Sequence, residues 1–245
     1  MFEKLRGFLS RLLPIKRWGK RIKDLFPRNR VAVEAKIFST YLYAQGSSLR
    51  KLSALLRDLG VKATHVSIWK WFQRLGERLK EFAFRRRKRR CIVADETKIR
   101  TLNGWIFVFA AIDPENREMV YLHISKHRET IDVLRFLRRV LRYCEGNPVL
   151  VTDGGLWYRW PAKRLGLEHI VMSGGERNYI ERWFETFKDR LRIFDCYFPT
   201  RGFESIENFS SAFCFWYNEC RYHTSVKGPP SGGEGGFKTW LEVLS

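Results

Sequence analysis

The chain has 245 residues and 44% hydrophobic content, enough for one domain of ordinary size and a smaller one, so a disordered tail is excluded. Forty-six Lys and Arg against 26 Asp and Glu give a formal net charge of +20, which indicates a polyanionic partner. No apolar run approaches the roughly 20 residues of a membrane span, and the N-terminus lacks the continuous apolar region of a secretory signal. We expect a cytosolic protein without a membrane partner.

Residues 1–30 predict a basic amphipathic segment. Its apolar residues follow a helical spacing until Pro14, with Lys and Arg between them. Packing or contact with a partner is the expected role of such a stripe, rather than membrane binding. The stripe consists of Phe2, Leu5, Phe8, Leu9, Leu12 and Leu13.

Residues 31–84 predict a helix-turn-helix domain. Ser48 is a suitable N-cap for a helix that ends near Gly60, and Thr64 begins a second helix whose apolar residues are Val66, Trp69 and Phe72. Two short helices joined by a Gly-containing turn form this outline, although an ordinary helical hairpin has it too. The residues expected to enter a major groove are His65, Lys70, Gln73 and Arg74.

Residues 85–90 are six consecutive cations, which no core could bury unpaired. We interpret them as a solvated basic linker that contacts backbone phosphates without carrying sequence information. They are Arg85, Arg86, Arg87, Lys88, Arg89 and Arg90.

Residues 91–230 predict a mixed α/β domain. Three strand-like segments (CIVADE, GWIFVFAAID and EMVYLHIS) predict an antiparallel meander. A helix over 129–143, the strand PVLVTD, a further helix and strand, and a long helix from Arg177 complete the order βββαβαβα. This order is that of a ribonuclease H-like domain, and residues 231–245 would form a C-terminal tail.

Two aspartates lie on the predicted strands. Asp153 ends a strand before a Gly pair, at a sheet edge where open α/β sheets form their sites. Asp95 lies in an apolar strand, where an acid is costly unless a partner such as a hard divalent cation pairs with it.

The long helix offers the third carboxylate. At about 100° per residue, Glu181 projects nearer the apolar stripe of Ile180, Phe184, Phe187 and Leu191 than Glu185 does. Lys188 lies two turns after Glu181 on the same side. Three acids on separate elements suit phosphoryl chemistry with two metal ions, one activating the attacking oxygen and one stabilising the leaving oxygen.

Five segments, in order, resemble the DDE transposases of insertion sequences, especially the small single-protein kind of insertion-sequence family six. They are SLRKLSALLRDLG with VSIWKWFQRL, the DET at Asp95, VTDGGLWY, NYIERWFETFK, and FWYNECRYHTSVKGPPS. The resemblance covers 47 to about 231 and makes Asp95, Asp153 and Glu181 the ligands of two divalent metal ions, Mg²⁺ or Mn²⁺, with Lys188 as the associated basic residue.

The resemblance also matches Asn218, Arg221 and His223 to a downstream segment that supports DNA or the fold, with Arg221 expected to contact DNA. One departure concerns the interval between Asp153 and the third acid, which is shorter than is typical of the family. Glu185 therefore stays the alternative ligand, in which case Arg192 would replace Lys188.

The implied activity is cleavage of transposon 3′ ends and their joining to target DNA by a homodimer or larger assembly, with the helix-turn-helix on terminal inverted repeats. Double-stranded DNA is the expected partner, at the nucleoid, and no small-molecule substrate is expected. The alternatives are a transposase-derived DNA-binding protein without catalysis and a nuclease of the same fold that does not join strands.

The five cysteines are odd in number and form no Cys-x-x-Cys pair, so neither a disulfide framework nor a zinc ribbon is expected. We expect buried or partly buried thiols. They are Cys91, Cys144, Cys196, Cys214 and Cys220.

Overall fold

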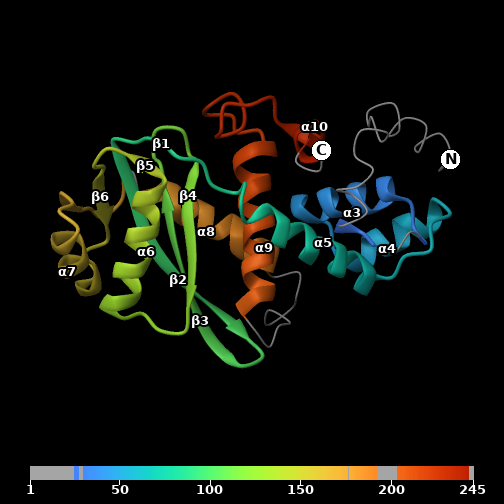
Figure 1. Ribbon diagram of the computed structural model, residues 1–245, viewed down its shortest axis with the longest axis horizontal. Helices are drawn as coiled ribbons and strands as arrows, with labels where there is room; N and C mark the ends of the chain where they lie inside the picture. Colours follow the sequence, from blue (N-terminus) through green and yellow to red (C-terminus); the bar gives the residue numbers. More distant parts are fainter. Residues whose placement is uncertain (1–24, 28–29, 176, 192–202, 243–245) are drawn as a thin grey trace. The chain divides into compact units, whose positions relative to one another are not determined.

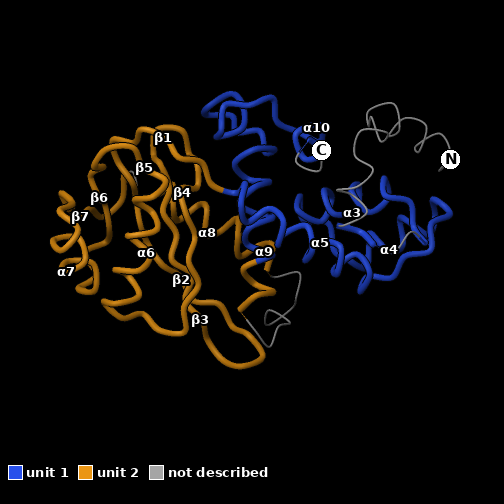
Figure 2. Tube along the Cα trace, in the orientation of Figure 1, with its two compact units in different colours: residues 1–83, 208–245 blue, residues 84–207 orange. Residues whose placement is uncertain are grey.

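The computed structural model describes residues 25–27, 30–175, 177–191 and 203–242. The chain divides into two compact units (Figure 2). Unit 1 combines residues 1–83 with 208–245, and unit 2 is the segment 84–207 between them. Most of the expected basic segment at 1–30 lies outside the described residues.

Among the described residues of unit 1, three helices before residue 80 have ends that follow local sequence signals (Figure 1). They are α3 (Val33–Gln45), α4 (Leu49–Asp58) and α5 (His65–Leu79). The Ser48 side chain accepts a hydrogen bond from the backbone N–H of Lys51, and the Thr64 side chain accepts one from Ser67. The predicted helix bounds and caps of the α4–α5 pair are therefore confirmed.

The buried face of α5 differs from the predicted stripe. Val66 is 46% exposed and Trp69 is half-buried, whereas Phe72 is buried as expected. The difference arises because α5 packs closely against a distant segment: a Cβ at Gly76 would lie 2.0 Å from the backbone oxygen of Asn208. The residues that α5 buries are Ile68, Trp71, Phe72, Leu75, Gly76 and Leu79.

The C-terminal part of unit 1 starts within helix α9 (Phe203–Phe215) and continues through the π-helix η3 (Trp216–Cys220) to α10 (Gly236–Glu242). Residues 208–230, which we expected in the α/β domain, thus group with the N-terminal helices. Aromatic packing accounts for this: the Phe72 and Phe209 ring centroids are 5.7 Å apart. In addition, Nδ2 of Asn218 donates to the carbonyl of Ala83 over 3.1 Å.

Unit 2 contains a five-stranded sheet in the order β4-β3-β2-β6-β7 (Figure 1). The strands β2, β3 and β4 are antiparallel neighbours, and β6 and β7 continue the sheet in parallel. The predicted order βββαβαβα and the ribonuclease H-like architecture are confirmed. The elements are β2 (Cys91–Thr101), β3 (Gly104–Ile112), β4 (Met119–Ser125), α6 (Thr130–Arg142), β6 (Val149–Thr152), α7 (Leu156–Arg164), β7 (His169–Val171) and α8 (Arg177–Leu191).

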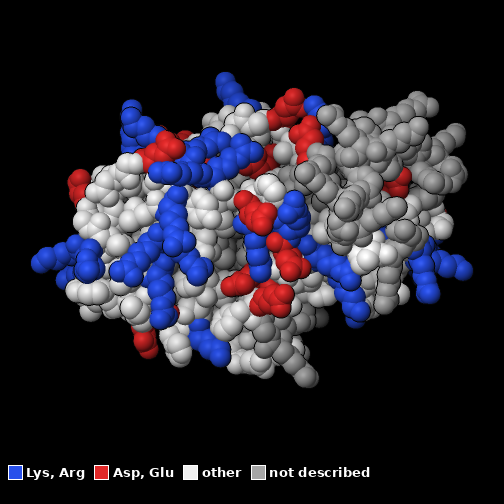
Figure 3. All heavy atoms as spheres, viewed as in Figure 1, with Lys and Arg blue, Asp and Glu red and all other residues white. Residues whose placement is uncertain are grey.

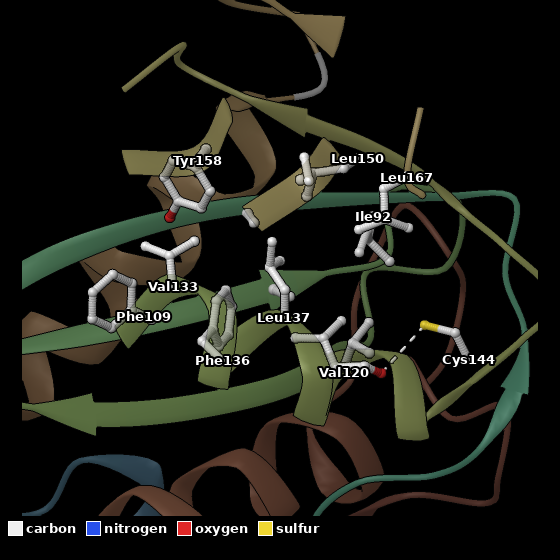
Figure 4. Packing of buried hydrophobic residues seen from close by; sticks show 14 residues of the cluster. Ile92, Phe109, Val120, Val133, Phe136, Leu137, Cys144, Leu150, Tyr158 and Leu167 are labelled. Carbon is white, nitrogen blue, oxygen red and sulfur yellow. Dashed lines mark hydrogen bonds between the residues drawn. The ribbon is translucent and has the colours of Figure 1, made fainter. Parts of the chain in front are cut away.

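The sheet separates two buried layers. On one face, side chains of the sheet pack with α6 and α7 in a cluster that includes Phe109, Phe136 and Tyr158 (Figure 4). Helix α8 packs against β2 and β3 and buries its whole predicted stripe of Ile180, Phe184, Phe187 and Leu191. Because strand side chains alternate between faces, the residues next to one another on β2 belong to different layers.

The six cations at 85–90 do not form a uniformly solvated linker. Residues Arg87–Lys88 form strand β1, which pairs with β5 (Cys144–Glu145). Arg89 is buried, with its guanidinium 2.8 Å from Asp113 Oδ2 and 3.0 Å from Glu118 Oε2. Pairing with two acids allows this charge to be buried, so the expectation of a phosphate contact is wrong for Arg89.

Two further expectations from the sequence concern the burial of the cysteine side chains and the absence of membrane-spanning helices. Among the described cysteines, Cys144, Cys214 and Cys220 are buried and Cys91 is partly buried, as expected. Cys196 lies outside the described residues. Within the described part of the chain, no helix is both long enough and apolar enough to cross a membrane.

Candidate active site

Asp95 and Asp153 lie at corresponding positions of neighbouring parallel strands. In the pairing of β2 with β6, Val93 is the partner of Val151, and each aspartate comes two residues later in its own chain segment. Since neighbouring strands are about 4.8 Å apart, this register brings the two carboxylates together. Their mutual repulsion is one of the causes that raise the pKa of Asp95.

The turn after β6 fixes the backbone around Asp153. Gly154 has φ +86°, and its N–H donates to the Thr152 hydroxyl, which also bonds Nε2 of His169 over 2.8 Å. The N–H of Gly155 donates to Oδ1 of Asp153. This turn leaves Asp153 exposed, while the preceding Thr152 is held to β7.

Asp95 is the more buried of the two aspartates, with 14% of its side chain exposed. Burial is the largest cause that raises its pKa. The backbone N–H of Glu96 donates to Asp95 Oδ1 over 2.8 Å and, like the Arg177 guanidinium, favours the charged form. A carboxylate in this position is stabilised by any further positive charge that approaches it.

Arg177 links Glu181 to Asp95, because its guanidinium contacts both carboxylates. Nη2 of Arg177, in the first turn of α8, lies 3.4 Å from Asp95 Oδ2 and 3.4 Å from Glu181 Oε1. Glu185, one turn further along α8, is exposed and makes no ion pair with Arg177. Lys188 is also exposed on α8.

Glu96 is a second buried acid on β2 that sequence reasoning missed. It points to the face opposite Asp95, where the Tyr158 hydroxyl donates to its Oε2 over 2.8 Å and Arg128 lies 3.3 Å from its Oε1. The Arg128 guanidinium in turn lies 4.0 Å over the Trp157 ring. This network attaches the start of α7 to the strand that carries Asp95.

The sequence contained local signals for two of the residues at this site, Glu96 and Arg177. Strand alternation alone assigns Glu96 to the face opposite Asp95. Arg177 precedes Glu181 by four residues, the spacing at which helical side chains pair. The partners of Glu96 could not be found in this way, because Tyr158 is 62 residues away in the chain.

The donor chemistry fits a hard divalent cation, since Asp95, Asp153 and Glu181 supply only carboxylate oxygens. Within the described ranges, however, no three His, Cys, Asp or Glu side chains are gathered as a metal-binding group. The positive charge between Asp95 and Glu181 is the guanidinium of Arg177.

The residues predicted to contact DNA are distributed over both units. On α5, His65, Lys70 and Arg74 are exposed, whereas Gln73 is half-buried. In unit 2 the exposed cations of the 85–90 segment are Arg85, Arg86, Lys88 and Arg90, while Arg87 is half-buried and lies 3.5 Å from Glu118.

The downstream residues Asn218, Arg221 and His223 belong to unit 1, whereas the three acids belong to unit 2. The Arg221 guanidinium lies over the rings of Trp216 and Tyr217, at 5.8 and 5.4 Å. The His223 ring packs edge-on against Tyr217, with centroids 4.8 Å apart. Together with the Asn218 bond to Ala83, these contacts support the fold of unit 1.

The strand order of unit 2 defines a ribonuclease H-like fold, with one acid on β2 and another directly after β6 at matching positions. A family model described as a DDE domain matches residues 90–220, more than half of the chain. The chain therefore belongs to the DDE transposase family.

One related protein matches a larger part of the chain than the family model does. An uncharacterized protein of Methanocaldococcus jannaschii is 34% identical over 197 residues, which cover 80% of this chain and 91% of the relative. A transposase for the insertion sequence-like element IS431mec of Staphylococcus aureus is 25% identical over 128 residues. That alignment covers 51% of this chain and 54% of the staphylococcal transposase, about half the length of each.

Two solved structures are similar to part of the chain. The catalytic core domain of BIV integrase is 15% identical with a TM-score of 0.42, covering 58% of this chain and 90% of the integrase domain. A chain of the simian T-cell lymphotropic virus intasome, in complex with PP2A regulatory subunit B56 gamma, is 13% identical with a TM-score of 0.47, covering 60% of this chain and 55% of its own. The assignment of the fold rests on the strand order above.

Proposed function

We propose that this protein is a transposase that cuts the 3′ ends of an insertion sequence and joins them to target DNA. The observation that supports the proposal is the register of β2 and β6, which aligns Asp95 with Asp153, while Arg177 links Asp95 to Glu181 on α8. These three carboxylates would hold two divalent metal ions, Mg²⁺ or Mn²⁺, which supply activation of the attacking oxygen and stabilisation of the leaving oxygen.

The chain's own residues would have distinct parts. Asp95 and Asp153 would bind from the sheet, and Glu181, preferred to Glu185 because only it pairs with Arg177, would bind from α8. Lys188 would contact phosphate two turns further along α8. The Glu96–Tyr158 bond would keep α7 and the Asp153 turn in position against β2.

DNA recognition would use the α4–α5 pair as a helix-turn-helix on the terminal inverted repeats. The exposure of three of the four residues predicted for the major groove supports this. Exposed cations near 85–90 would contact phosphates. Synapsis of two transposon ends would require at least a homodimer, acting on chromosomal DNA at the nucleoid of the cytoplasm.

The decisive experiment is strand transfer with pre-cut transposon ends and plasmid target in Mg²⁺. Asp153→Asn removes one proposed ligand charge without changing side-chain size, and we expect joining to fall by about 100-fold or more. Glu145→Gln, an exposed acid-to-amide change on β5, is the matched control and should join at the wild-type rate.

Joining by Asp153→Asn at the wild-type rate would contradict the proposed site. Wild-type protein that nicks DNA but never joins pre-cut ends would be a nuclease of the same fold. Binding to the terminal repeats without cleavage or joining would identify a DNA-binding protein that has lost catalysis.

A further inference from the structure

Arg177 makes an unusual double contact at the candidate active site. A single nitrogen, Nη2, is 3.4 Å from a carboxylate oxygen of Asp95 and also 3.4 Å from one of Glu181. The Arg177 side chain is only 15% exposed. One guanidinium thus contacts two of the three acids and offsets part of their negative charge.

The contact of Arg177 with the two acids is weaker than the strongest contact that a guanidinium makes with a carboxylate. Guanidinium and carboxylate groups pair most strongly through two parallel hydrogen bonds of about 2.7–2.9 Å. Arg177 instead uses one nitrogen at longer distances. This contact offsets part of the negative charge of the two acids, but it leaves the buried Nε of Arg177 without a hydrogen-bond partner among the described residues.

The pairing also conflicts with the proposed role of the acids. Asp95 and Glu181 would hold the cation, and Asp95 Oδ2 and Glu181 Oε1 are both in contact with Arg177. A divalent ion bound by these acids and the guanidinium of Arg177 would repel one another. The two cations are thus alternatives for the same pair of acids.

We propose that Arg177 is a positioning residue that acts as an internal counter-ion, holding Asp95 and Glu181 until a divalent metal ion displaces its guanidinium. This inference rests on the proposed metal role of the acids. It predicts that Arg177 lowers the affinity of the protein for metal while stabilising the metal-free form. Its Nε would gain solvent or phosphate partners once the side chain leaves the acids.

The test is Mn²⁺ titration by calorimetry on the full chain without DNA, for wild type and Arg177→Gln. We expect the Kd for Mn²⁺ to fall by about tenfold in the variant, because displacing the guanidinium no longer opposes binding. In EDTA the variant should have a lower Tm than wild type, and Mn²⁺ should raise its Tm by more.

Arg182→Gln is the matched control, since it removes one charge from an exposed position on the same helix. It should change the Kd by less than about twofold, as expected for a screened surface charge. Arg177→Lys retains the charge and should keep a Kd closer to that of wild type.

The outcomes separate the two proposals. Equal or weaker Mn²⁺ binding by Arg177→Gln, with binding by wild type intact, would overturn the counter-ion role alone. No Mn²⁺ binding by either protein would overturn the proposed metal site and the counter-ion role with it. If Arg177→Gln does not fold, a Kd for Arg177→Lys equal to that of wild type supports the inference, and a Kd raised tenfold overturns it.

Discussion

At the scale of single residues, Arg89 shows how its neighbours decide the role of a charge. It belongs to a run of six cations, yet its side chain is fully buried between Asp113 and Glu118. Its Nη2 also donates to the carbonyl of Arg85 over 3.2 Å. The residue therefore stabilises the start of the sheet instead of being available to phosphate.

Replacing Arg89 with Met should reduce the free energy of unfolding by about 3–5 kcal/mol, because Asp113 would stay buried without its ion-pair partner and Glu118 would keep only the longer contact with Arg87. Urea denaturation followed by circular dichroism measures the change. Arg90→Met, at the exposed neighbouring position, should stay within about 0.5 kcal/mol of wild type. Equal effects of the two changes would show that the buried ion pairs do not stabilise unit 2.

The aspartates were predictable from their strands because an acid within an apolar strand and an acid before a Gly pair are local patterns. Glu96 and Arg89 were not, since each depends on partners far away in the chain. The Glu96 carboxylate meets Tyr158 only after α7 folds onto the sheet, and Arg89 meets Glu118, 29 residues away, only after β3 and β4 pair.

At the scale of elements, the turn from β6 to α7 combines two restrictions at one residue. Gly154 has a left-handed backbone conformation, and a Cβ there would lie 2.6 Å from Cγ1 of Val171. The same turn carries Asp153. Its backbone therefore positions a candidate metal ligand at a place where L-residues with side chains are strained.

Gly154→Ala should lower the free energy of unfolding by about 2–3 kcal/mol, through strain at positive φ and the contact with Val171. Gly166→Ala is the control, because Gly166 has φ +67° but open space around it, and should cost only about 1 kcal/mol. Adding Val171→Ala should recover part of the Gly154→Ala loss. Urea titration of all four proteins gives the comparison, and no recovery would exclude the steric part.

Helix ends were predicted better than helix faces. Ser48 and Thr64 cap α4 and α5 as expected, since capping depends on residues within one turn. By contrast, Ile131 of α6 has a helical spacing with the buried Leu134 and Leu137 but is 44% exposed. The buried side of α6 instead includes Val133 and Phe136, because the sheet that it covers decides its orientation.

At the scale of the whole molecule, part of the positive charge that gives the chain its net charge of +20 is gathered in one region of the surface. Figure 3 shows Lys and Arg gathered over α6 and near β1 on one face of unit 2. The exposed arginines of α6 are Arg135, Arg138, Arg139 and Arg142, and none of them was singled out from the sequence. A charge pattern of this kind follows from helix orientation, which local patterns do not specify.

The proposed phosphate contacts near β1 predict a salt effect. The logarithm of DNA affinity should fall with the logarithm of salt concentration, with a slope of about 0.9 per neutralised phosphate. Replacing Arg86 and Lys88 with Gln should reduce that slope by about 0.9 for each. Fluorescence anisotropy from 50 to about 200 mM salt measures it.

The control is Lys238→Gln in α10, whose charge is already paired with Glu234 and Glu242. It should leave the slope unchanged. A slope that Arg86→Gln and Lys88→Gln do not alter would show that these cations make no phosphate contact.

The interrupted unit 1 has a consequence for how the protein is made. Every residue of unit 2 leaves the ribosome before residue 208, so its sheet can be completed while unit 1 still lacks α10 and the larger part of α9. The helices α3, α4 and α5 are synthesised before unit 2, but Phe72 and Gly76 find their partners at Phe209 and Asn208 only after unit 2 has been synthesised. These helices of unit 1 thus stay incompletely packed until then, whereas unit 2 is able to fold first.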